Sequence, residues 1–226
     1  MTFFSAQQYT SLKHTLHSFL AMLLSIAAFV VPASSVNYPS ALYYSAIFLV
    51  ISSLLFLFYR TEREPFCRLE KAMLISWLVY PVMTALDMCL RAGWIWTEFQ
   101  EPSRFLLVLP IFLMARRVGF SQDMLKWGVF VGACASAGWA FHQHIGLGQR
   151  AGGGTSDLIA AFGDISLMLG VLTIALFQPQ WRLQKRWLLL ALLGLFFGVF
   201  ASLASGTKGG WISIPFLIWI MVDLTD

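Results

Sequence analysis

Residues 187–204 read WLLLALLGLFFGVFASLA, a run of eighteen residues without a charged side chain. An α-helix rises about 1.5 Å per residue, and the hydrocarbon core of a bilayer is about 30 Å thick. About 20 mostly apolar residues are therefore enough to cross a membrane. The length and composition of this run predict a transmembrane helix, and the question becomes how many others the chain contains.

The composition of the whole chain agrees with a membrane protein. Of 226 residues, 58% are hydrophobic and 12% are charged, whereas soluble domains contain about 45–50% apolar and about 25% charged residues. These values exclude an ordinary soluble globule and also intrinsic disorder, which requires low hydrophobicity. The net charge of +4 comes from scattered basic residues rather than a basic patch, so the sequence predicts no nucleic-acid binding.

Eight apolar segments are candidates for membrane helices, of which the fourth is short and contains Pro110. The first contains no typical signal-peptide n-region, because Lys13 is the only Lys or Arg before it. We therefore predict an all-α fold, a polytopic transmembrane helix bundle of about eight spans that forms one transmembrane domain over residues 1–226. The predicted spans are Ser18–Ser35, Ala41–Tyr59, Ala72–Leu90, Arg104–Ala115, Leu125–Ile145, Leu158–Phe177, Trp187–Ala204 and Trp211–Val222.

The basic residues predict the orientation of these spans. Cytoplasmic loops of membrane proteins are enriched in Lys and Arg. With a cytoplasmic N-terminus, eleven of the fifteen basic residues fall on the inner side and four on the outer side. We therefore predict that the N-terminus is cytoplasmic. The four outer residues are Arg91, Arg104, Arg150 and Lys208.

The loop that contains Arg150 is the strongest candidate for a binding site. Residues 146–157 read GLGQRAGGGTSD, with five glycines among residues 146–154. Glycine lets backbone N–H groups approach a ligand closely, and an arginine fork suits phosphate oxygens. Ser156 or Asp157 would cap the following helix, whose N-terminus also favours anions. The sequence predicts an anion site here; the alternative is a flexible loop with a solvated arginine.

Other polar residues of the spans and outer loops have two interpretations each. Lys208 lies in SGTKGGW, residues 205–211, which is either a second cationic loop or an ordinary tight turn. Asp164 is either functional, with Arg150 or Lys208 as its partner, or purely structural. Asp87 precedes Arg91 by four residues, which predicts an ion pair. The motif His142-x-His144 lacks a third ligand, and the three cysteines show no CxxC spacing, so we predict no metal site.

Three of these segments together resemble one protein family. They are Arg150–Gly153 (RAGG), Phe162–Asp164 (FGD) and Ser205–Trp211 (SGTKGGW), in that order. Glu101–Leu107 (EPSRFLL) is in addition similar to an acidic-x-x-Arg segment that opens a middle helix in this family. The chain resembles the O-antigen ligase family, which includes O-antigen polymerases and bacterial O-oligosaccharyltransferases. The resemblance covers roughly residues 70–226.

The resemblance implies a multi-pass enzyme of the bacterial inner membrane with a periplasmic active face. Such enzymes transfer a glycan from an undecaprenyl diphosphate carrier to lipid A-core, a growing polysaccharide or a protein hydroxyl, without a metal or other cofactor. By this resemblance Arg150, Lys208 and Arg104 would bind the donor diphosphate. Supporting residues would be Asp164, Gly152, Gly153 and Ser205. Membrane lipids are expected partners as well, because outer basic side chains also reach lipid headgroups.

Two differences from the family limit what the resemblance implies. Lys208 stands where the family usually has arginine, which keeps the charge but loses the bidentate fork. The family's general-base histidine lies in a large periplasmic loop beyond the region seen here, so no residue of this chain is assigned as catalytic. The chain is then either the N-terminal portion of a longer transferase or a shortened relative. The competing hypotheses are a transporter or channel with Asp164 and Arg150 along its pathway, and a structural subunit.

Overall fold

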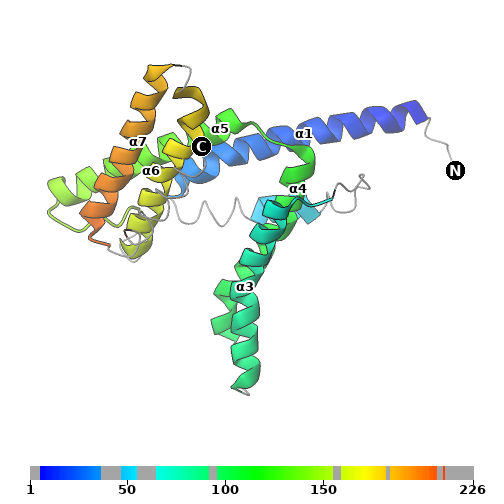
Figure 1. The fold of residues 1–226 in the computed structure, drawn as a ribbon, viewed down its shortest axis with the longest axis horizontal. Helices are drawn as coiled ribbons and strands as arrows, with labels where there is room; N and C mark the ends of the chain where they lie inside the picture. The colour runs from blue at the N-terminus through cyan, green and yellow to red at the C-terminus, as the bar shows by residue number, and fades with distance from the viewer. Residues whose placement is uncertain are drawn as a thin grey trace. The chain divides into compact units, whose positions relative to one another are not determined.

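The computed structural model describes residues 6–36, 47–54, 65–91, 96–154, 159–181, 184–207 and 211 (Figure 1). The described residues form helices and connecting turns and contain no strand, which confirms the all-α fold. The chain divides into two units, Met1–Ala21 with Ala46–Gly119 and Met22–Ser45 with Phe120–Asp226. The helices are α1 (Ala6–Ser34), α3 (Arg68–Leu90), α4 (Trp96–Val118), α5 (Gln122–Ala140), the π-helix η1 (Phe141–Gly146), α6 (Ile159–Trp181) and α7 (Lys185–Ser205).

Five of the described helical segments are long and apolar enough to cross a membrane. They correspond to the first, third, fifth, sixth and seventh predicted spans. The second and eighth predicted spans lie largely outside the described residues, although residues 47–54 are helical. The five segments are Thr15–Ser34, Arg68–Leu90, Gln122–Gly146, Ala161–Gln178 and Lys185–Ser205.

The fourth predicted span, Arg104–Ala115, is the central part of a longer helix. Helix α4 has 23 residues and contains Glu98 in its first turn and Arg116 and Arg117 in its last. A helix continues through such charged ends because Glu and Arg have high helix propensity. This helix is not among the five apolar segments, so the count of eight spans and their orientation remain predictions.

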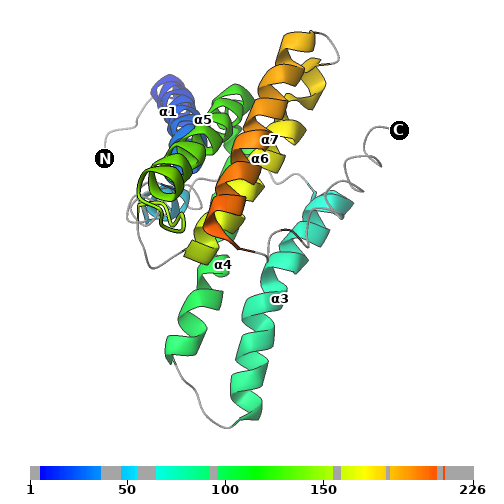
Figure 2. The same cartoon turned by 90° about the vertical axis from the view of Figure 1, so that its left-hand side faces the viewer.

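In the first unit, α3 and α4 lie side by side and antiparallel (Figure 2). Trp77 packs edge-on against Phe112, with ring centroids 5.6 Å apart. Near the start of α3, Glu70 forms an ion pair of 2.6 Å with Arg116 at the end of α4. Glu70 also accepts a hydrogen bond from the backbone N–H of Cys67 at 2.8 Å, which completes a capping box. One carboxylate therefore both begins α3 and fastens it to α4.

The second unit is a bundle of α5, α6 and α7. Trp127 at the start of α5 and Trp187 at the start of α7 both pack on Phe177 near the end of α6, so α6 runs antiparallel to the other two helices. Glycines bring the helix backbones together: a Cβ on Gly198 of α7 would lie 2.7 Å from the Cα of Gly170 on α6. Gly128 and Gly132 of α5 approach the end of α1 in the same way, at the backbone of Phe29 and Pro32. Small residues four positions apart, such as Gly128 and Gly132, are typical of close helix packing in membranes. The bundle thus holds the ends of its helices in fixed register.

Candidate functional site

The loop after η1 folds onto the C-terminal end of α7. The backbone N–H of Ala151 donates to the carbonyl of Ala204 at 3.1 Å, and Nε of Arg150 donates to the carbonyl of Ser205 at 2.9 Å. The last carbonyls of a helix lack partners within the helix, so the loop satisfies two of them. Gly206 then ends α7 in the left-handed conformation with φ 69°. Arg150 is therefore fixed against the end of α7.

The start of α6 meets the same place. A Cβ on Gly163 would overlap the hydroxyl oxygens of Ser205 and Thr207, so only glycine fits here. The two hydroxyls are themselves 2.8 Å apart. Phe162 packs on Gly153, where a Cβ would lie 2.7 Å from its ring. Segments 150–153, 162–164 and 205–207, which the sequence analysis singled out separately, thus meet in one place. We call them the polar end of the bundle.

Gln143 holds this arrangement together and was not predicted from the sequence. Its Oε1 accepts hydrogen bonds from the backbone N–H groups of Gly152 at 2.7 Å and Gly153 at 3.1 Å. Its Nε2 donates to the carbonyl of Gly153 at 2.7 Å. The available signal was a primary amide at the end of an apolar helix beside a glycine-rich loop, because an amide both donates and accepts.

One expectation about the loop needs correction. We expected its glycine N–H groups to face a ligand, but the N–H groups of Ala151, Gly152 and Gly153 donate within the protein, as given above. Gly154 donates to the carbonyl of Val36 at 3.3 Å. Buried backbone donors need partners, and in a bundle end the nearest partners are protein groups. An anion at the polar end would therefore bind side chains, foremost that of Arg150, which is an exposed residue, rather than these amides.

The other predicted residues fall in different places. Asp164 lies on α6 directly after Gly163 and is exposed. Lys208 and the predicted capping residues Ser156 and Asp157 lie outside the described residues. Arg104 belongs to α4 in the first unit, and its side chain is likewise outside the description. Of the predicted diphosphate ligands, the structure thus describes the side chain of Arg150.

Two simpler predictions concern ion pairs and metals. Arg91, directly after α3, and Asp87 of α3 form an ion pair of 2.9 Å on the surface, which confirms the predicted pair. Among the residues that the structure describes, no group of three or more His, Cys, Asp or Glu side chains is close enough to hold a metal ion. His142 and His144 are both exposed on η1.

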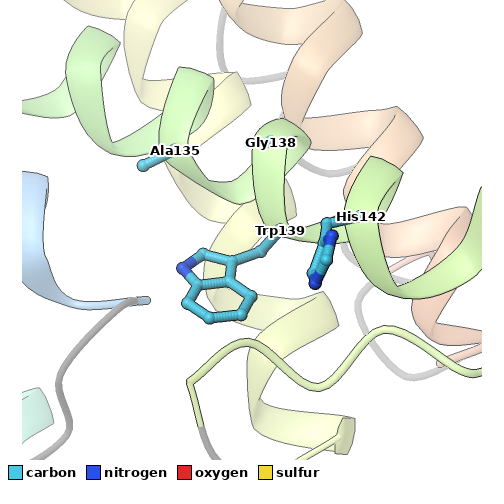
Figure 3. Close-up of a pocket in the computed structure, with 4 residues that line it drawn as sticks. All are labelled: Ala135, Gly138, Trp139 and His142. Atoms are coloured by element: carbon cyan, nitrogen blue, oxygen red, sulfur yellow. The ribbon is translucent and has the colours of Figure 1, made fainter. Parts of the chain in front are cut away.

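A pocket lies beside the polar end, on helix α5. It has a volume of about 360 Å³ and is lined by Ala135, Gly138, Trp139 and His142. Figure 3 shows the rings of Trp139 and His142 on the same side of the helix, with ring centroids 6.3 Å apart. Positions three, four and seven residues apart share a helix face. His142 therefore lines the pocket, while its neighbour Gln143 binds the glycine loop.

Comparison with known proteins gives one distant similarity. No protein-family model and no solved structure matches the chain. The chain is 22% identical, over 187 residues, to an uncharacterized protein of Haemophilus influenzae (strain ATCC 51907 / DSM 11121 / KW20 / Rd). The match covers 82% of this chain and 46% of that protein. The chain thus spans about half the length of this curated relative, and its name assigns no activity.

Proposed function

We propose that the chain is a membrane glycan transferase of the O-antigen ligase type, or the N-terminal portion of one. It would move a glycan from an undecaprenyl diphosphate carrier to lipid A-core or another acceptor at the periplasmic face of a bacterial inner membrane. The observation that carries the proposal is the junction of Arg150 with the end of α7. Its 2.9 Å bond to Ser205 brings together two segments that are 55 residues apart and that the family resemblance rests on.

The chemistry of the reaction fits a fixed arginine at this position. When the glycosidic carbon–oxygen bond of the donor breaks, negative charge builds up on the diphosphate leaving group. A preorganised cation stabilises this charge in the transition state, and a guanidinium binds phosphate oxygens in bidentate fashion. In the described part of the chain, Arg150 bonds through Nε, and its two terminal nitrogens remain for the donor.

The remaining predicted residues take roles around Arg150. Lys208 directly follows Thr207 in the sequence and would supply the second cation. Asp164 and Ser205 would order this cationic pair. Gly152 and Gly153 act by holding the loop through Gln143, instead of binding the donor with their N–H groups. Arg104 belongs to α4 in the other unit, and its part in donor binding is assigned by the family resemblance alone.

The arrangement of the bundle also supports one active face. The end of α5, the start of α6 and the end of α7 meet at the polar end. If the N-terminus is cytoplasmic, as the basic residues predict, this end lies on the periplasmic side. The donor diphosphate of a lipid carrier lies at the membrane surface, so the polar end would meet it at the right depth.

The test is substitution in the complete gene in its own bacterium. We expect Arg150→Ala to lower glycan transfer by about 100-fold or more, the usual effect of removing one preorganised charge-stabilising group. Lys208→Ala should lower it by a similar or smaller factor. Arg91→Ala is the matched control, because this outer arginine is paired with Asp87. Surface glycan would be assayed by gel electrophoresis of lipopolysaccharide and by glycoprotein staining.

The outcome depends on protein level as well as activity. Loss of surface glycan at a normal level of the Arg150→Ala protein in the membrane would support the proposal. Normal glycan in this variant, again at a normal protein level, would overturn it. A loss that Arg91→Ala reproduces would also count against a specific role for Arg150.

A further inference from the structure

We infer that Gln143 is the positioning residue for Arg150, an inference that rests on the proposed function. Gln143 contacts the loop at two points on either side of Arg150. Its backbone carbonyl accepts a hydrogen bond from the N–H of Gln149 at 2.9 Å. Its side-chain amide binds Gly152 and Gly153 at 2.7–3.1 Å. The loop is therefore wrapped around one residue, with Arg150 between the two attachments.

The π-helical turn explains how one residue makes both attachments. Helix α5 changes to the π-helix η1 at Phe141–Gly146, and π turns are often found at functional sites. After this turn the next N–H groups bond further back along the chain: Leu147 donates to His142 at 3.1 Å, and Gln149 donates to Gln143. The chain thus reverses around Gln143, whose side chain stays directed at the glycines.

The amide side chain is specific for this position. Gln143 accepts two hydrogen bonds and donates one, and all three partners are backbone groups of Gly152 and Gly153. A carboxylate in its place would keep the acceptor but would repel the carbonyl of Gly153. Alanine would leave all three backbone groups without their partner, which is costly where water is excluded. Only a primary amide of this length satisfies the whole set.

Limited proteolysis measures how firmly Gln143 holds the Arg150 loop, without any assay of function. Trypsin cleaves after Arg150 only when the loop opens. The purified protein in detergent would be digested, and the peptide ending at Arg150 would be quantified by mass spectrometry. We expect Gln143→Ala and Gln143→Glu to speed this cleavage by about tenfold or more, since several hydrogen bonds are lost. Gln149→Ala is the control, because its exposed side chain lies in the same loop.

Kinetics then separate positioning from a merely structural role. In membranes with the complete protein, Gln143→Ala should raise the KM for the lipid-linked donor and lower kcat, after correction for folded protein. Gln143→Asn keeps the amide and should recover part of the activity. A structural role alone would reduce the amount of folded protein and leave the KM of the remainder unchanged. If Gln143→Ala fails to fold, Gln143→Asn and Gln143→Glu provide the same comparison.

The outcomes distinguish this inference from the proposed function. Unchanged cleavage after Arg150 in the Gln143 variants would overturn the inference. Faster cleavage with unchanged donor KM would also overturn it, while loss of transfer in Arg150→Ala would still uphold the proposed function. If Arg150→Ala transfers glycan normally, the proposed function fails, and the positioning role fails with it whatever the cleavage shows.

Discussion

The two ends of the α5–α6–α7 bundle are held together by different forces. At one end, aromatic rings pack together: the centroids of Phe177 and Trp127 are 5.9 Å apart, and those of Phe177 and Trp187 are 5.7 Å apart. At the polar end, hydrogen bonds join Gln143, the Arg150 loop and the last carbonyls of α7. Ring packing therefore holds one end, and specific hydrogen bonds between donors and acceptors hold the other.

This difference indicates where chemistry is possible. Close van der Waals packing of rings holds helices together in a membrane. The aromatic end therefore stabilises the bundle but offers no polar group to a ligand. Buried backbone N–H and C=O groups, such as those of residues 151–153, must find hydrogen-bond partners within the protein. The polar end achieves this with a loop, and the loop presents one exposed cation. Substitutions at the aromatic end should therefore lower mainly stability, and substitutions at the polar end should lower mainly function.

The largest effect is expected at the aromatic end. Phe177 is completely buried, and Phe177→Ala should lower stability by about 3–5 kcal/mol through loss of packing and a cavity. The measurement is thermal unfolding in detergent. Phe196→Ala, at a site that is 62% exposed, is the control and should change little. Under the proposed function, the Phe177→Ala molecules that remain folded should transfer glycan at the normal rate. Equal losses of stability in the two variants would contradict the comparison.

A smaller loss of stability with a large loss of function is expected at the polar end. Gly163→Val would force a side chain into the hydroxyls of Ser205 and Thr207, and overpacking of this kind costs about 1–3 kcal/mol. Under the proposed function, glycan transfer should fall much further, because the Arg150 loop and α7 would separate. Gly138→Val is a matched helical control, with nothing within 4 Å of its Cβ. Thermal unfolding and glycan transfer would be measured for both variants. Full transfer by Gly163→Val would show that the contact of α6 with the end of α7 is not needed for function.

The smallest effect compares two buried serines on α7. Ser205 donates to the carbonyl of Ser202 at 2.7 Å and contacts the hydroxyl of Thr207, so Ser205→Ala should cost about 1 kcal/mol. The hydroxyl oxygen of Ser202 is buried without a partner among the described residues. Ser202→Ala should therefore be neutral or slightly stabilising. The stability of both variants would be compared by thermal unfolding. An equal loss of stability in both would show that the hydrogen bonds of Ser205 add nothing to the stability of the bundle.

The sequence predicted the helices better than the contacts at their ends. A long apolar run such as residues 187–204 needs no partner to be recognised, because its period and length are local properties. For Arg150 and Ser205, the sequence predicted only that their loops lie on the same side of the membrane, and not that the two residues are in contact. Gln143 was not predicted, since its role depends on a π-helical turn and on glycines nine and ten residues later. Hydrogen-bond partners of this kind become visible only in three dimensions.

The most direct test of the central claim is a disulfide across the polar end. Ala151→Cys and Ala204→Cys would be combined in a protein whose native cysteines are replaced. The backbone hydrogen bond of 3.1 Å between these two residues brings their main chains together, and a disulfide forms only between residues whose Cα atoms lie within about 7 Å. Thr173→Cys with Ala191→Cys, between α6 and α7, is the positive control. We predict efficient crosslinking of both pairs in native membranes, and crosslinking of the control pair alone would contradict the account.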